Sequence, residues 1–301
     1  MSVNVNGMLG YGRRLPVRRW GKISSRWRRL PVKTAHWLTL GVAVAVAIAP
    51  IYWLANLATH SESDIVSGRP SLLLGFGSLG GVTDPPNDIP ILSWLRNSLI
   101  VGVGTSLLSI VLAASAAFGL SRFRFRGWGT FAFLVFFTQM LPSALLVIPL
   151  YSMLLTFNLL NNLVSLVLVD AAFAMPICVW IIKGAMDRIP RELDEAVRLD
   201  GGGSLGLLRR VILPLVAPSI AAAAVVAFLG GWNDFLFANT FITSENLWTT
   251  SKGLASLYGQ YSTPIPLIMA FALLFSLPPV AFFLLMQRRI VAGLTAGAVK
   301  G

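Results

Sequence analysis

The chain has 301 residues, of which 55% are hydrophobic and only 12% are charged, and its formal net charge at pH 7 is +12. Its mean hydropathy of +0.74 leaves too few polar side chains to cover the surface of a water-soluble protein of this size. The composition therefore excludes a soluble globular protein and predicts an integral membrane protein.

Six stretches of the chain are long and apolar enough to cross a bilayer, since a spanning helix needs about 20 mainly apolar residues. None of them alternates between polar and apolar residues as a barrel strand does, so the predicted fold is an all-α integral membrane protein. The third stretch contains Pro142 and Pro149 and the fifth contains Gly230–Gly231, so we expect these two spans to be kinked or tilted. In chain order the predicted spans are residues 36–57, 97–120, 128–155, 163–183, 215–242 and 264–286.

A basic segment, residues 1–35, precedes the first span. Basic residues before an apolar stretch are also typical of a cleaved signal peptide. Here the apolar stretch runs to about 20 residues and ends in aromatic residues of an interface belt, Tyr52 and Trp53. We therefore expect an uncleaved first span, so that the chain divides into a basic N-terminal segment and a transmembrane domain over residues 36–301.

Lysine and arginine are distributed unevenly among the loops. Of the 24, 21 lie before the first span, after the second, between the fourth and fifth, or after the sixth, and the other three are Arg69, Arg96 and Lys252. The positive-inside rule places the four basic segments, and with them both termini, in the cytoplasm. Membrane topology and attraction to anionic lipid explain the basicity, so no nucleic-acid partner is expected. Residues 58–92, rich in Gly, Pro and Ser, are then an outer loop, either a connector or a docking surface for an external partner.

The most polar run in the second half of the chain is a loop over about residues 184–214, between the fourth and fifth spans. Glu192 and two further acids predict the start of a helix, which Gly201 and the two glycines after it end. A second short helix is expected over residues 205–213. Acids and bases are mixed in the first helix, which argues against a helix lying on lipid and favours one that enters a groove of another protein.

This loop resembles the coupling segment of the permease subunits of ABC importers. The family pattern is Glu-Ala-Ala, three residues, Gly, nine residues and Ile-x-Leu-Pro, and the chain has Glu195-Ala196-Val197, Gly201 and Val211-Ile212-Leu213-Pro214 at that spacing. Val197 and Val211 are conservative departures from the pattern. The runs "WLRNSLIVG", "AAFGLSRFRFRG", "GGWNDFLFA" and "GLTAGAVKG" resemble more narrowly the six-helix, maltose-type permeases of carbohydrate uptake.

The resemblance covers about residues 36–301 and implies a type I ABC importer permease in the cytoplasmic (inner) membrane of a bacterium or archaeon. Its implied partners are a second, different permease subunit, two copies of an ABC ATPase and an extracytoplasmic solute-binding protein. The chain has no G-x-x-x-x-G-K-[ST] run for phosphate binding, so ATP and Mg belong to the ATPase and this subunit is no enzyme. The implied solute is an oligosaccharide or related polyol, with a glycerol-phosphate-like solute as the alternative.

The resemblance also implies how the loop works. When the ATPases close, the docked loop moves as a rigid body and tilts the fourth and fifth spans, which exchanges an inward-facing for an outward-facing cavity. We expect Glu195 to pair with a base of the ATPase groove, Ala196 to permit close approach and Gly201 to form the turn. The predicted coupling residues are Glu192, Glu195, Ala196, Val197, Asp200, Gly201, Leu213 and Pro214.

Two acids lie inside predicted spans, where ionisable residues are costly and commonly functional. Trp232, Asn233 and Asp234 offer a stacking ring and hydrogen-bonding groups of the kind that sugars need. Asp170, in the fourth span, faces either the translocation path or a partner subunit. The alternative for the first group is that Trp232 anchors at the interface and Asn233 caps a kinked helix.

Two other classes of membrane protein fit the sequence less well. A secondary transporter would have inverted repeats with discontinuous helices in both halves, and no such pairing is visible between residues 36–155 and 163–286. A membrane enzyme would need convergent acid, base or nucleophilic groups, which two His, one Cys and two distant acids do not supply, so no catalytic residue is expected. The same residues have no metal-ligand spacing.

Overall fold

The computed structural model of the protein describes residues 29–67, 72–74, 89–124, 126–259 and 264–298. Most of the predicted basic segment at residues 1–35 and about half of the predicted outer loop at residues 58–92 lie outside these ranges. The chain divides into two compact units, Met1–Ile51 and Tyr52–Gly301, which are described separately.

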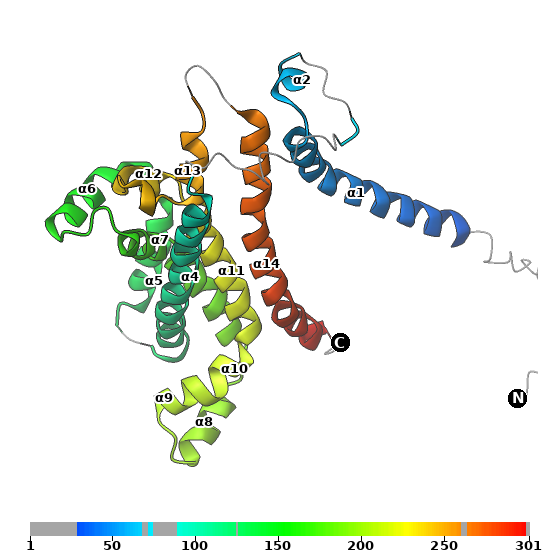
Figure 1. Cartoon of the computed structure of the whole chain (residues 1–301). Coiled ribbons are helices and arrows are strands. Elements are labelled where there is room, and N and C mark those ends of the chain that lie inside the picture. Colours follow the sequence, from blue (N-terminus) through cyan, green and yellow to red (C-terminus); the bar gives the residue numbers. More distant parts are fainter. Residues whose placement is uncertain (1–28, 68–71, 75–88, 125, 260–263, 299–301) are drawn as a thin grey trace, which may run out of the picture. The chain divides into compact units, whose positions relative to one another are not determined.

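Every regular element in the described ranges is a helix, which confirms the predicted all-α fold (Figure 1). Two short elements, η1 and η3, are 3₁₀-helices and η2 is a π-helix. In chain order the bounds are α1 Arg29–Ala58, α2 Glu62–Val66, α4 Ile91–Arg122, α5 Trp128–Phe137, η1 Thr138–Met140, α6 Ser143–Thr156, α7 Leu163–Met186, α8 Glu192–Leu199, α9 Ser204–Leu207, η2 Leu208–Ile212, α10 Leu213–Leu215, α11 Ala217–Asn233, α12 Leu236–Phe241, η3 Glu245–Leu247, α13 Thr250–Ser256 and α14 Ile265–Ala298.

Four of the predicted spans are confirmed as single helices that are long and apolar enough to cross a membrane. They are His36–Ala58 within α1, all of α4, all of α7 and Ile265–Ile290 within α14. Helix α1 makes up the whole described part of the first unit, where apolar side chains such as Leu38 and Val46 are exposed. The other two predicted spans correspond to bent pairs of helices, so six spans result if each pair crosses as one.

The third predicted span is bent by 101° between Trp128–Met140 and Ser143–Thr156. The break falls at Pro142, whose extended backbone precedes the first residue of α6. Proline has no N–H to donate and disfavours a helical residue before it, so it separates two helices here. The expected kink is confirmed at Pro142, whereas Pro149 lies inside α6 without ending it.

The prediction for the fifth span, residues 215–242, is wrong about where the helix breaks and where it ends. Helix α11 runs without interruption through Gly230–Gly231 and ends at Asn233. A Cβ on Gly231 would lie 2.7 Å from Thr105 Oγ1 on α4, so this glycine permits close packing of two helices and does not break one. The 80° bend lies earlier, between Ser204–Leu215 and α11.

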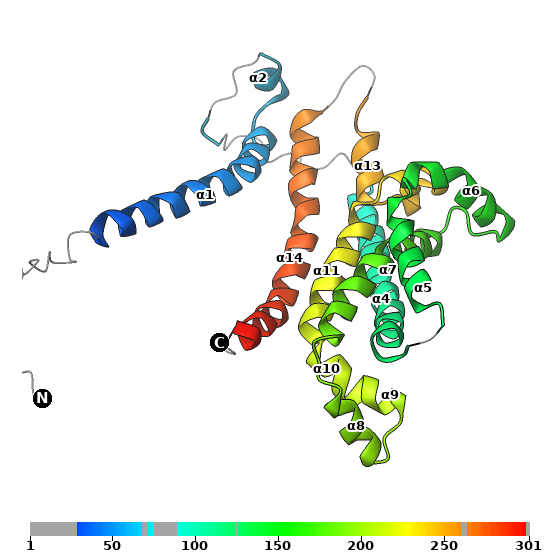
Figure 2. The same ribbon diagram turned by 180° about the vertical axis from the view of Figure 1, so that it is seen from behind.

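The core of the second unit is built where α4 packs against α7 and α11, while α11 also contacts α14 (Figures 1 and 2). Small residues such as Ala117 and Ala227 are fully buried there, which brings the helix backbones together. Hydroxyl groups bond across the contacts: Ser106 Oγ donates to the Ala224 carbonyl at 2.9 Å, and Ser109 Oγ to the Ala171 carbonyl at 3.4 Å. These three helices form one packed body.

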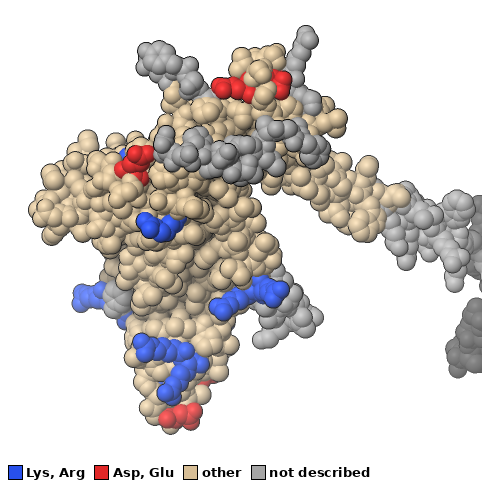
Figure 3. All heavy atoms as spheres, viewed as in Figure 1, with Lys and Arg blue, Asp and Glu red and all other residues tan. Residues whose placement is uncertain are grey.

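Lysine and arginine gather at the end of the second unit that contains α8 to α10, which we call the basic end (Figure 3). The C-terminus of α4 and the last turn of α7 lie there too, with Arg122 and Lys183. Arg96 and Lys252 belong to the opposite end, near the start of α4 and in α13. The segment after α4 and the loop between α7 and α11, which the positive-inside rule assigns to one side of the membrane, therefore meet at one end of this unit.

Candidate functional site

The loop at the basic end, residues 184–214, begins with α8. Glu192 and two further acids occupy its first turn, where the partial positive charge of the helix N-terminus stabilises carboxylates. The helix stops at Gly201, which has a left-handed backbone (φ +76°). The Gly202 N–H then donates to the Val197 carbonyl at 2.8 Å, and a Cβ on Gly202 would lie 2.6 Å from Val197 Cγ1. The turn therefore needs glycine at both positions.

The return from α8 to the membrane is not the single regular helix expected over residues 205–213. It consists of α9, the π-helix η2 and the single turn α10, and the 80° bend follows at Val216. Pro214 lies at the start of α10, where a backbone N–H would have no partner within the helix. Its missing N–H therefore costs no helical hydrogen bond.

A buried ion pair attaches α8 to α4. Arg122 Nε lies 3.0 Å from Asp194 Oδ2, and the two side chains are only 5% and 11% exposed. Arg122 Nη2 also donates to the Ile189 carbonyl at 3.3 Å, and Arg191 Nη2 donates to the Ser121 carbonyl at 3.4 Å. Neither partner was singled out from the sequence as a site residue, because the two are 72 positions apart and no local pattern links them.

The predicted coupling residues divide by exposure. Val197 is half-buried and packs against the core, and Leu213 is also half-buried. Three leucines of the loop, absent from the prediction, are exposed by 39% (Leu193), 89% (Leu199) and 60% (Leu205). Apolar side chains of this size on a charged loop indicate a contact surface for another molecule. The other predicted residues, Glu192, Glu195, Ala196, Asp200, Gly201 and Pro214, are all exposed.

A cavity of about 490 Å³ lies between α7, α11 and α12. It brings together three of the four predicted pathway residues, Asp170, Asn233 and Asp234. Trp232 does not line the cavity. The residue is only 4% exposed, and its ring stacks on that of Phe228 with 5.7 Å between the ring centres. The polar side chains that line this cavity are one amide, two carboxyl groups and the hydroxyl of Ser143 from the start of α6, among apolar neighbours. This arrangement is suited to binding a polar, uncharged solute.

The two carboxyl groups of the cavity have different partners. Asp234 accepts hydrogen bonds from the N–H groups of Phe237 (3.1 Å) and Ala238 (2.8 Å), so it caps α12 and forms the break after α11. This capping role was considered for Asn233 and belongs to its neighbour. Asp170 is 6% exposed, and its Oδ2 has no hydrogen-bond partner among the described residues.

The described residues contain no group of three His, Cys, Asp or Glu side chains that could hold a metal ion. Cys178 is buried, and its Sγ lies 3.5 Å from the Ala223 carbonyl in the contact between α7 and α11. This thiol contributes to helix packing.

Comparison with known families gives a match to the binding-protein-dependent transport system inner membrane component over residues 106–295. These residues include α7, the whole loop and α11. The chain belongs to this family. It is therefore a multi-pass membrane permease, and the suspected resemblance to the permeases of ABC importers is confirmed.

Curated relatives cover nearly the whole permease. The trehalose transport system permease protein of Mycobacterium tuberculosis is 32% identical over 274 residues, covering 89% of this chain and 98% of the relative. The trehalose/maltose transport system permease protein of Thermococcus litoralis is 32% identical, covering 85% and 92%. The arabinooligosaccharides transport system permease protein of Halalkalibacterium halodurans is 30% identical, covering 88% and 96%.

The fold of the permease matches a chain in the crystal structure of a bacterial ABC transporter involved in the import of the acidic polysaccharide alginate. The TM-score is 0.72 at 19% identity, covering 88% of this chain and 98% of that one. The arrangement of helices is therefore that of an ABC importer permease.

Proposed function

We propose that this permease is the membrane subunit of an ATP-driven sugar importer, in which the loop over residues 184–214 couples an ATPase to alternating access. The observation that carries the proposal is the state of that loop. Leu193, Glu195 and Ala196 are exposed at the basic end, whereas Asp194 is buried and paired with Arg122. One face of the loop is therefore open to a partner, and the opposite face is fixed to α4.

The anchoring explains how a pull on the loop would reach the membrane. Helix α8 follows α7 directly, is joined to α4 by the Arg122–Asp194 pair, and leads through α10 to α11. These three helices pack against one another, so they respond to a displaced loop together. The cavity of Asp170, Asn233 and Asp234 lies between α7 and α11, where a change in the angle of the helices would open or close it.

The solute that we propose is an oligosaccharide or related polyol. The relatives named above are transport proteins for trehalose, maltose and arabinooligosaccharides. The cavity supports the same class, because Asn233 and two carboxyl groups supply hydrogen-bonding groups for the hydroxyls of such a solute. A glycerol-phosphate-like solute is the alternative.

The proposed assembly contains a second, different permease subunit, two copies of an ABC ATPase and an extracytoplasmic solute-binding protein. ATP and Mg would bind to the ATPase. We place the complex in the cytoplasmic membrane, with both termini of this chain in the cytoplasm. The clustering of Lys and Arg at the end with the loop supports this orientation.

Two experiments test the proposal. A photoreactive amino acid at position 196, introduced in the native host, should crosslink the chain to an ATPase, and capture of lipid alone would refute a docked loop. A host strain lacking this chain should lose energy-dependent uptake of a labelled sugar from a panel with trehalose, maltose and arabinooligosaccharides, and recover it on complementation. Restored uptake of glycerol 3-phosphate alone would overturn the substrate class, and uptake driven by an ion gradient without ATP would overturn the importer.

A further inference from the structure

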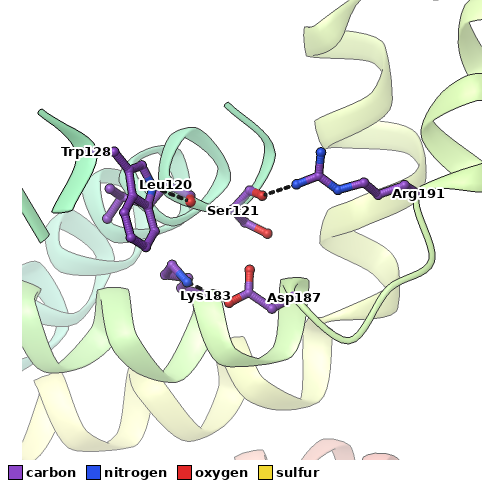
Figure 4. A network of polar contacts seen from close by, with 6 residues as sticks. All are labelled: Leu120, Ser121, Trp128, Lys183, Asp187 and Arg191. Atoms are coloured by element: carbon purple, nitrogen blue, oxygen red, sulfur yellow. Dashed lines mark hydrogen bonds and ion pairs between the residues drawn. The ribbon is translucent and has the colours of Figure 1, made fainter. Parts of the chain in front are cut away.

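A second pocket, of about 580 Å³, lies at the basic end, outside the cavity and the exposed face of the loop. It is formed where α4 ends, α5 begins, α7 ends and the chain approaches α8. Figure 4 shows Trp128, Lys183, Asp187 and Arg191 from these segments, and Arg124 completes the charged lining. Nothing in the proposed transport cycle uses these side chains.

The charges of this basic pocket do not cancel. Lys183 Nζ donates to Asp187 Oδ2 at 2.6 Å, so the one acid of the lining neutralises one cation. Burial raises the pKa of Asp187, but hydrogen bonds from Lys183 and Ser121 and the positive charges of Lys183 and Arg122 outweigh burial, so the pKa lies below its ordinary value. Asp187 therefore stays ionised at neutral pH. Arg124 is exposed and has no ion pair or hydrogen bond among the described residues, and Arg191 bonds only to a backbone carbonyl there.

Aromatic residues place this pocket at the level of the lipid headgroups. Lys183 Nζ lies 5.4 Å from the ring centre of Trp128 and 5.9 Å from that of Trp180, and Trp128 Nε1 donates to the Leu120 carbonyl at 2.8 Å. Tryptophan is enriched where spans leave the hydrocarbon, with its ring in the interface. Helix α5 runs into the membrane from Trp128, and its side chains Phe133 and Leu134 are exposed. A hydrocarbon chain would find an apolar surface directly beside the pocket.

We propose that the basic pocket binds the phosphodiester headgroup of an anionic membrane lipid, whose acyl chains lie along the exposed face of α5. Arg124, Lys183 and Arg191 surround the phosphate, because guanidinium groups match its oxygens with paired donors and lysine adds a point charge. The bound lipid bridges the ends of α4, α5 and α7. It also contacts Arg191, one residue before α8, so it stiffens the point at which the loop leaves the membrane.

The test uses the full chain purified in detergent, titrated with phosphatidylglycerol or phosphatidylcholine and analysed by native mass spectrometry. We expect phosphatidylglycerol to remain bound and phosphatidylcholine to dissociate. Arg124→Gln should weaken phosphatidylglycerol binding about fivefold, since one basic residue near an anionic headgroup contributes about that factor. Arg126→Gln is the matched control: it removes the same charge from an exposed residue two positions away that does not line the pocket, and binding should not change.

Three results would overturn the proposal. Equal retention of the two lipids would show that the headgroup charge is not recognised. Equal weakening by Arg124→Gln and Arg126→Gln, with both variants melting at the wild-type temperature, would show a general attraction of the basic end to anions. Binding of inorganic phosphate that displaces phosphatidylglycerol and depends equally on Arg124 would assign the pocket to a soluble anion.

Discussion

Acidic side chains of the loop and of the membrane cavity are satisfied in different ways. In the loop, Asp194 is buried and meets the charge of Arg122 at 3.0 Å. In the cavity, Asp170 is buried as well, but it has no ion pair among the described residues. One oxygen of each carboxyl group, Asp194 Oδ1 and Asp170 Oδ2, lacks a hydrogen-bond partner there, so the difference lies in the paired charge. A buried carboxyl group with no ionic partner points to a missing partner such as water, solute or another subunit.

The difference indicates which parts of the permease are complete on their own. The buried acid of the loop has its charge paired within the chain, and the exposed face of the loop is available to a partner. The cavity supplies polar groups that the chain does not fully satisfy, as expected where a solute passes or where a second subunit closes the site. Four predictions test this contrast.

The largest expected effect is that of Glu195→Lys. We expect the variant to insert and to lose ATP-driven uptake entirely, because a reversed charge on the exposed face would meet a base of the ATPase groove. Uptake of labelled sugar by the complemented host strain measures this. Glu245→Lys, the same reversal on an exposed residue of η3, should transport normally. Normal uptake by Glu195→Lys would show that this face of the loop does not take part in energy coupling.

Asp194→Ala should lower the free energy of unfolding of the purified chain by about 3–5 kcal/mol, because it leaves the buried charge of Arg122 unpaired. Asp170→Asn should cost much less, since Asp170 has no ion pair among the described residues and asparagine keeps the size of the side chain. Unfolding in detergent, followed by circular dichroism, compares the two. Similar losses would mean that both acids are structural, and the contrast between loop and cavity would fail.

Gly202→Ala should destabilise the chain by about 1–3 kcal/mol, since its Cβ would overlap Val197. Gly203→Ala is the adjacent control, because a Cβ there has no neighbour within 4 Å. The same unfolding assay applies, with uptake as a second readout. If both alanines are tolerated, the turn after α8 is looser than its geometry indicates.

The smallest effect is expected for Asn233→Ala. Loss of one hydrogen bond to an uncharged solute costs about 1 kcal/mol, so the KM for uptake should rise about fivefold while stability is unchanged. Asn239→Ala removes the same amide from an exposed position of α12 that does not line the cavity, and should leave KM unaltered. A KM equal to that of the wild type would exclude Asn233 from the solute path.

Much of the fold follows from local sequence. Apolar length alone identifies α4, α7 and the spans within α1 and α14, because the bilayer thickness fixes how many apolar residues a helix needs. Pro142 marks the break between α5 and α6 because the missing N–H is a property of the residue itself. Features of this kind need no knowledge of the rest of the chain.

Other features depend on what a residue meets in space. Glycine is a helix-breaking residue type, yet Gly231 lies inside α11 and packs against Thr105. The close approach of α4, which the local sequence does not show, explains why glycine is there. The spacing of Glu195 and Gly201 locates the loop, but the Arg122–Asp194 pair that anchors it joins distant segments. Three of the four pathway residues meet in the cavity, and Trp232 is turned away by its contact with Phe228.

The π-helix η2, at Leu208–Ile212, affects how this loop can change in length. Its wide turn holds more residues than an α-helical turn, and each residue of an α-helix advances the direction of the chain by about 100°. Deleting one residue of η2 would let the wide turn close into an ordinary α-helical turn, so the flanking segments could keep nearly their present directions. Deleting one residue inside α8 has no such outlet, because it would rotate the residues before and after the deletion by about 100° relative to each other. A single-codon deletion is therefore tolerated more readily in η2 than in α8.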